Sequence, residues 1–210
     1  MTPTAARNMS NHLASDQPER ALAVARAIEA PWFRCQALAH VARYWPDENY
    51  DRFLEEAVRA GDLQDDVYSQ VAVSAWPIRA YLERGNPTPA RKLLAKYTRA
   101  ASAIENLGGR SQALFTIFQS SKPFAPDLWQ PVFWAVVSAA EPALAWRQRR
   151  NLRDAAAMVA SDHPELVQEA LKKMSDEKNL SLISRDLDKS DKRKVEPRPF
   201  FGLTDAERRP

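Results

Sequence analysis

The chain has 210 residues, of which 45% are hydrophobic and six are tryptophan, so it can bury a sizeable core and is not a largely disordered protein. No apolar run reaches the roughly 18 to 20 residues of a membrane-spanning helix, so we expect no membrane span. The start of the chain lacks the pattern of a secretory signal, and the single cysteine, Cys35, leaves no intrachain disulfide to form. These features predict a soluble, cytoplasmic protein.

Positive charge is concentrated at the C-terminal end. The formal net charge is +3, but residues 189–210 hold seven of the 30 basic residues and only four of the 27 acidic ones. The rest of the chain therefore holds 23 residues of each sign and is neutral. A surface that coats nucleic acid normally clusters positive charge along one face, so a neutral body weakens that interpretation.

Taken in order, the chain begins with residues 1–15, which are rich in Thr, Ala and Asn and are expected to be flexible. Up to residue 188, apolar residues then recur at the i, i+3, i+4, i+7 spacing of amphipathic helices. No strand pattern interrupts them. Proline, aspartate or glycine marks most boundaries. The expected helix starts are Asp16, Pro31, Asp47, Asp65, Thr88, residue 110, Asp127, Glu141 and Asp162, with a weaker tenth helix at residues 180–187.

Several helix boundaries rest on specific signals. Gly61 is expected to stop the third helix and Pro77 to end the fourth, and residues 106–109 are expected to form a loop. Two starts have the spacing of a capping box, in which an N-cap side chain and a glutamate three residues later satisfy each other's backbone N–H: Asp16 with Glu19, and Asp162 with Glu165.

One short pattern recurs along the chain. Residues 34–42 return in similar form at 110–118, with looser copies at 69–76 and 153–160. Repeats of this length, near 40 residues, are typical of stacked helical hairpins. Residues 16–188 resemble the tetratricopeptide and HEAT class of α-solenoids, at the level of the class. The Gly-Tyr signature of tetratricopeptides is absent, so the resemblance assigns no ligand-binding residue.

We therefore expect an all-α fold of about five stacked antiparallel hairpins, forming a short right-handed α-solenoid over residues 16–188. The alternative is a closed globular all-α domain whose helices look repetitive because amphipathic helices generally do. Residues 189–210 are expected to form a basic, disordered tail in which Phe200 and Phe201 provide a short apolar anchor.

The sequence contains no recognisable catalytic motif. Its three histidines, His12, His40 and His163, do not have metal-ligand spacing, and Cys35 occupies a repeat position held elsewhere by serine. Gly108 and Gly109 form an isolated pair, not a phosphate-binding loop. We expect no cofactor, no bound metal and no enzymatic activity.

The most distinctive polar cluster begins at Trp146, which shares a helix face with Arg150 and Arg153 at the i, i+4, i+7 spacing. Like charges so close together favour an anionic counterpart. The ordinary interpretation is pairing with acidic residues of the next hairpin; the functional one is binding of an acidic peptide. Outside this cluster, Trp32 and Trp129 are expected on an exposed groove, where they could contact a partner. The partner-binding candidates are Trp146, Arg147, Arg149, Arg150, Arg153, Trp32, Trp129, Phe200 and Phe201.

The preferred function is a non-catalytic scaffold that binds a peptide or protein partner on a concave groove, within a larger assembly. One alternative is a nucleic-acid-binding repeat protein that uses residues 147–153 and the basic tail, with binding that falls steeply with salt. A second is an enzyme on a HEAT-like scaffold, such as the base-excision glycosylases of that architecture, but their paired-tryptophan-and-aspartate pattern is not recognisable here.

Overall fold

A computed structural model describes residues 1–140, 146–174, 181 and 184–185 of the protein. This part of the chain contains ten α-helices and no strand, which confirms the all-α prediction. The chain divides into two compact units, Met1–Ala103 and Ile104–Pro210, and each is described by itself.

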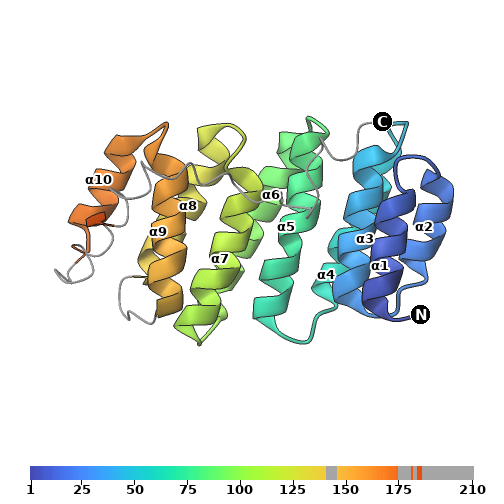
Figure 1. The fold of residues 1–210 in the computed structure, drawn as a ribbon, viewed down its shortest axis with the longest axis horizontal. Helices are drawn as coiled ribbons and strands as arrows, with labels where there is room; N and C mark the ends of the chain where they lie inside the picture. Colours follow the sequence, from blue (N-terminus) through green and yellow to red (C-terminus); the bar gives the residue numbers. More distant parts are fainter. Residues whose placement is uncertain (141–145, 175–180, 182–183, 186–210) are drawn as a thin grey trace. The chain divides into compact units, whose positions relative to one another are not determined.

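In the first unit, α1, α3 and α5 pack in a row, α1 against α3 and α3 against α5 (Figure 1). The other helices pack onto this row: α2 contacts α1 and α3, α4 contacts α3 and α5, and α6 contacts α5. The elements are α1 (Pro3–Leu13), α2 (Pro18–Arg26), α3 (Pro31–Tyr44), α4 (Tyr50–Asp62), α5 (Val67–Glu83), α6 (Pro87–Ala100) and a short 3-10 turn (Ala101–Ala103).

The second unit repeats this local arrangement. Its α7 packs against α9, α8 contacts both of them, and α10 contacts α9. Its helices are α7 (Leu107–Ser121), α8 (Pro126–Ala140), α9 (Trp146–Ala160) and α10 (Pro164–Lys172). The expected tenth helix and the tail at 189–210, with Phe200 and Phe201, lie outside the described residues except for positions 181 and 184–185.

The N-terminal residues differ from the expected flexible segment, because they form α1. The Thr2 side chain accepts a hydrogen bond from the Ala5 N–H and so caps this helix. Small buried residues, Ala6, Ser10 and Ala14, recur every four positions. The Ser10 hydroxyl also donates to the backbone carbonyl of Ala21 at 3.0 Å. This stripe of small side chains lets α1 lie close to α2. The helix was not expected from the sequence because this segment contains few large apolar residues.

Both expected capping boxes are absent from the structure. The N-caps of α2 and α10 are Gln17 and His163, and neither makes a side-chain capping bond. Each precedes a proline, which holds the preceding residue away from helical geometry and so starts the helix one position later than expected. Side-chain caps occur instead at Asp66 and Asn106, so the expected loop at 106–109 is the start of α7.

Pro77 lies inside α5 and does not end it, and α4 ends at Asp62, one residue after Gly61, so Gly61 lies within the helix and not at the expected C′ position. Because Pro77 has no N–H, it cannot donate to the carbonyl of Val73 four residues earlier. The Cys35 thiol on α3 lies 3.7 Å from this carbonyl and donates to it. A Cβ at Gly61 would lie 3.2 Å from Val73 Cγ1 and 3.5 Å from Cys35 Sγ. Gly61 therefore permits a close helix crossing, and α5 continues through Pro77 to Glu83.

The pairing of helices also differs from the expected one. The sequence pattern paired α2 with α3 and α4 with α5, whereas α3 packs more extensively against α4 than against α2. The missing side chain at Gly61 does not explain this difference, because a Cβ there would be crowded by Val73 of α5 and would make only an ordinary contact with Cys35 of α3.

We expect Cys35→Ala to lower the free energy of unfolding of the first unit by about 1–3 kcal/mol, because it removes the donor from a buried carbonyl. Burial raises the pKa of the Cys35 thiol above its ordinary value, so the thiol is protonated and able to donate at neutral pH. Denaturant unfolding measures the loss. Cys35→Ser keeps a donor, so it should cost less than Cys35→Ala; equal losses for the two variants would contradict this role of the thiol.

Candidate binding surface

The candidate surface lies on α9, whose opposite face is fixed to the second unit. Leu152, Ala155 and Val159 are buried, as a helical spacing of apolar residues requires. Two buried polar side chains add directional contacts. Gln148 Nε2 donates to the Ala139 carbonyl at 3.1 Å, and Asn151 Nδ2 donates to Ser111 Oγ at 3.2 Å. These contacts fix the rotation of α9 and so determine which side chains face solvent.

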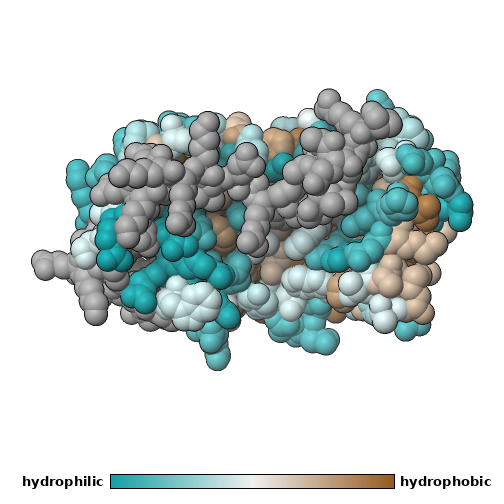
Figure 2. Space-filling model, in the orientation of Figure 1, coloured by the Kyte–Doolittle hydropathy of each residue, from teal (hydrophilic) through white to brown (hydrophobic). Residues whose placement is uncertain are grey.

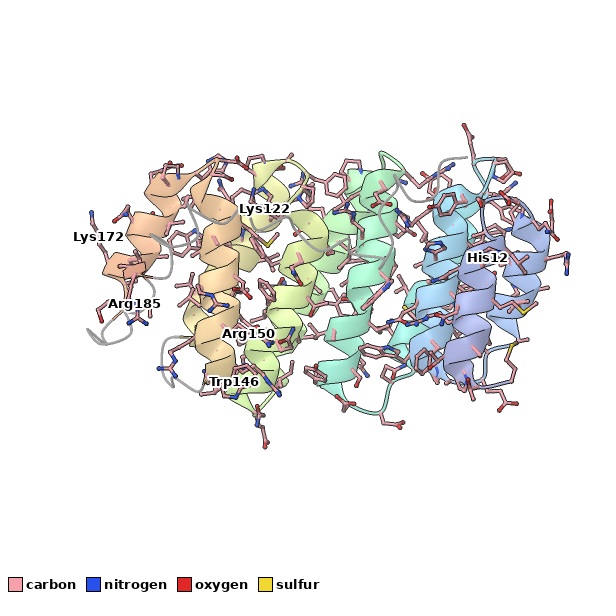
Figure 3. The ribbon with its side chains drawn as sticks, viewed as in Figure 1. His12, Lys122, Trp146, Arg150, Lys172 and Arg185 are labelled. Atoms are coloured by element: carbon pink, nitrogen blue, oxygen red, sulfur yellow. The ribbon has the colours of Figure 1, made fainter. Side chains whose placement is uncertain are left out.

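Trp146 begins α9 and is 59% exposed, an uncommon position for the largest side chain in proteins. Figure 3 shows Trp146 at the first turn of α9 and Arg150 one turn further along. The Arg150 guanidinium carbon lies 5.0 Å from the indole centroid, and that of Arg147 lies 5.8 Å from it. Cation–π attraction therefore holds two guanidinium groups against an exposed aromatic ring.

The arginines of α9 differ in how far their charge is compensated. Arg153 forms an ion pair with its neighbour Asp154, with contacts of 2.8 and 2.9 Å. Arg150 donates to the neutral amide oxygen of Gln112 on α7 at 3.2 Å, so its charge is retained. Because α9 has four arginines and one aspartate, the formal net charge of the helix is +3. Figure 2 shows a hydrophilic area over this part of the second unit.

The structure thus brings together five of the predicted partner-binding residues. Trp146 and Arg147 are exposed, and the other three are half-buried. We call this set, Trp146, Arg147, Arg149, Arg150 and Arg153, the α9 surface.

Trp129 does not belong to an exposed groove, which corrects the sequence prediction. Its side chain is only 1% exposed. The indole packs edge-on against Phe118 at 6.1 Å between ring centroids and tilts against His163 at 5.4 Å. Lys122 lies over the ring with its Nζ 4.7 Å from the centroid. The helix pattern placed Trp129 off the main apolar stripe, but residues from α7 and α10 cover it there.

Trp32, the other isolated candidate, is half-buried in the first unit. It packs edge-on against Trp76 of α5, with 6.1 Å between the ring centroids. This contact assigns Trp32 a packing role between α3 and α5, with part of the ring still accessible.

A polar cluster around Lys122 was missed by the sequence analysis. Lys122 Nζ forms an ion pair with Asp162 Oδ2 at 3.0 Å, and its hydrogen bond holds the pKa of this carboxyl below its ordinary value. Because Lys122 also lies over Trp129, it links the end of α7 to both α8 and the start of α10 (Figure 3). The ion pair joins residues 40 positions apart, and no local pattern indicates it.

The histidines have separate environments. His12 is exposed on α1, His40 is fully buried and tilts against Tyr44, and His163 contacts Trp129 and Glu165. Among the residues that the structure describes, no group of three or more His, Cys, Asp or Glu side chains could hold a metal ion. The same part of the chain has no helix with the length and apolarity needed to cross a bilayer.

No protein-family model matches the sequence, and no curated protein or solved structure is significantly similar to it.

Proposed function

We propose that the protein is a non-catalytic interaction module that binds an acidic segment of a protein partner through the α9 surface. The observation that carries this proposal is the exposed Trp146 ring, which contacts the guanidinium groups of both Arg147 and Arg150. Tryptophan and arginine are the residue types most often found where binding energy is concentrated in protein interfaces. The net positive charge of α9 favours an acidic partner.

The arrangement also favours binding with little rearrangement. Cation–π contacts already restrict the Trp146 side chain, and Gln148 and Asn151 already fix the rotation of α9. Side chains that are ordered before association lose less conformational entropy when a partner binds. An acidic side chain could take a bidentate hydrogen bond from Arg147 or Arg150 while its neighbour packs on the indole.

We further propose that the helices continue one repeating pattern, as in the tetratricopeptide and HEAT class of α-solenoids, with about five hairpins, a right-handed twist and a cytoplasmic location. The support is that the same packing between neighbouring helices occurs inside each unit separately. In the first unit α2, α4 and α6 pack onto the row of α1, α3 and α5, and in the second unit α8 and α10 pack onto the pair of α7 and α9. Stacked repeats of this kind present long surfaces to partners.

We expect Arg150→Glu to weaken binding of an acidic probe at least tenfold, about 1.4 kcal/mol, because it replaces an attraction with a repulsion at the centre of the α9 surface. The probe is a fluorescein-labelled peptide of alternating Glu and Leu, measured by fluorescence anisotropy with the full-length protein. Trp146→Ala should also weaken binding, whereas Arg20→Glu, an equal charge change on the exposed side of α2, should not.

Two outcomes would contradict the proposal. One is equal affinity of the Arg150→Glu and Arg20→Glu variants for the peptide. The other is tighter binding of a single-stranded oligonucleotide with a steep salt dependence, which would favour the nucleic-acid alternative.

A further inference from the structure

A basic recess lies in the first unit, between α2 and α4 over the beginning of α3. Its volume is about 270 Å³, and it is open to solvent. This volume is below the roughly 300–1,000 Å³ of pockets for drug-sized ligands, so the recess suits a single side chain better than a cofactor. We call it the Arg34 pocket; its walls are Arg26, Arg34, Leu38, Glu56, Arg59, Ala60 and Leu63.

The charges in the Arg34 pocket are unevenly compensated. Arg26 and Glu56 neutralise each other through two hydrogen bonds of 2.9 and 2.6 Å, and this contact holds the pKa of Glu56 below its ordinary value. Arg59 makes only a long contact of 3.6 Å with Glu55, and both side chains are more than 60% exposed. The Arg34 side chain is half-buried, and its guanidinium makes no hydrogen bond or ion pair within the described part of the chain. The recess therefore has an excess of positive charge.

The equivalent arginine of the second unit has a different environment. Arg110 occupies the position of Arg34 in the recurring pattern, and its Nε donates to the backbone carbonyl of Ile104 at 2.9 Å. At Arg110 the guanidinium therefore supports the local fold, whereas at Arg34 the same group lines a recess and its donors are available. The two copies of the pattern therefore differ in whether the guanidinium is bound within the fold.

The apolar part of the Arg34 pocket restricts what the arginine can bind. Leu38 and Ala60 are buried and form its inner wall, and Leu63 is 61% exposed beside it. A glutamate side chain has methylene groups to cover this wall and a carboxylate that fits the two-donor edge of a guanidinium. A phosphate has no apolar part, and its second negative charge would be repelled by the Glu56 carboxylate.

We propose that the Arg34 pocket binds a glutamate side chain of a partner polypeptide, with an adjacent apolar residue of that partner packed on Leu63. The bound carboxylate accepts two hydrogen bonds from Arg34 and lies near the positive charge of Arg59. This site is separate from the α9 surface in sequence and in unit, and it does not depend on the function proposed for that surface.

The test uses NMR of the full-length protein, with labelled arginine side chains and leucine methyl groups. The probes are the peptide acetyl-Ala-Glu-Leu-Ala-amide, the same peptide with Gln in place of Glu, and inorganic phosphate. We expect saturable shifts of the Arg34 Nε–H signal and of the Leu38 and Leu63 methyl signals with the Glu peptide. The Gln peptide should bind at least tenfold more weakly.

Variants separate this site from the rest of the protein. Arg34→Gln should reduce the affinity for the Glu peptide at least tenfold without changing the rest of the spectrum, and Arg34→Lys should retain part of it because charge remains but the two-donor fork is lost. Arg20→Gln, at an exposed position of α2 outside the pocket walls, is the matched control. Arg150→Glu should leave the shifts at Arg34 unchanged, even though it is expected to weaken binding at the α9 surface.

Three results would overturn the proposal: equal shifts with the Glu and Gln peptides, unchanged binding by Arg34→Gln, or stronger binding of phosphate than of the Glu peptide at Arg34.

Discussion

Replacing Trp129 with alanine is expected to lower the free energy of unfolding of the second unit by about 3–5 kcal/mol, the usual cost of removing a fully buried large aromatic side chain. The indole is enclosed by Phe118 from α7 and by His163 at the start of α10, with Lys122 above the ring. Alanine would leave a cavity at the junction of three helices and remove the aromatic surface under the Lys122 ammonium.

Hydrogen exchange measured by mass spectrometry during denaturant titration can resolve this loss, because it reports the opening free energy of each unit separately. Trp134→Ala is the matched control. Trp134 is half-buried on the same helix and contacts Lys173, whose Nζ lies 4.1 Å from its ring centroid. We expect the control to cost less than half as much. A Trp129→Ala loss no larger than that of the control would mean that the second unit closes around the missing side chain.

Phe53→Ala is expected to have an effect of similar size, about 3–5 kcal/mol, on the first unit. Phe53 is 0% exposed and packs edge-on against Trp45 at 4.5 Å between ring centroids. The guanidinium carbons of Arg52 and Arg26 lie 4.7 and 5.5 Å from its ring centroid. Phe53 in α4 and Trp129 in α8 each stand three residues after the first residue of their helix, so a buried aromatic ring next to a cation recurs in both units.

Near-ultraviolet circular dichroism at equilibrium in urea would measure the Phe53→Ala loss through the environment of Trp45. Phe33→Ala provides the comparison, because Phe33 is half-buried and lies under a single guanidinium, that of Arg7, at 5.6 Å. If the two phenylalanine variants unfolded at the same urea concentration, burial at Phe53 would not be the main source of stability at the α3–α4 crossing.

The helices themselves could be predicted from the sequence, because their apolar spacing and the prolines at their starts are local features. What could not be predicted are the effects of contacts between distant residues. Pro77 has the local signature of a helix end, but Cys35, 42 positions earlier, compensates for its missing N–H. Gly61 has the signature of a helix stop, but its lack of a side chain leaves space for the side chains of Val73 and Cys35.

The α9 surface was predictable because its members lie within eight residues of each other on one helix. Trp129 was misplaced because His163 and Lys122, which cover it, come from other helices. The Arg34 pocket could not be predicted for the same reason, because the residues of α2 and α4 that surround Arg34 are distant from it in the sequence. A repeated motif predicts a common backbone position, but it does not reveal which copy has its polar groups satisfied.

The packing pattern also bears on how the protein acquires its structure. In the described residues, every extensive helix–helix contact joins two consecutive elements or two elements separated by a single element. Such a topology has a low contact order. Proteins of that kind fold on a microsecond-to-millisecond timescale, because the chain loses little entropy in closing the short loops that each stabilising contact requires. Each helix can therefore pack against its neighbours in the chain soon after synthesis, without waiting for distant parts of the polypeptide.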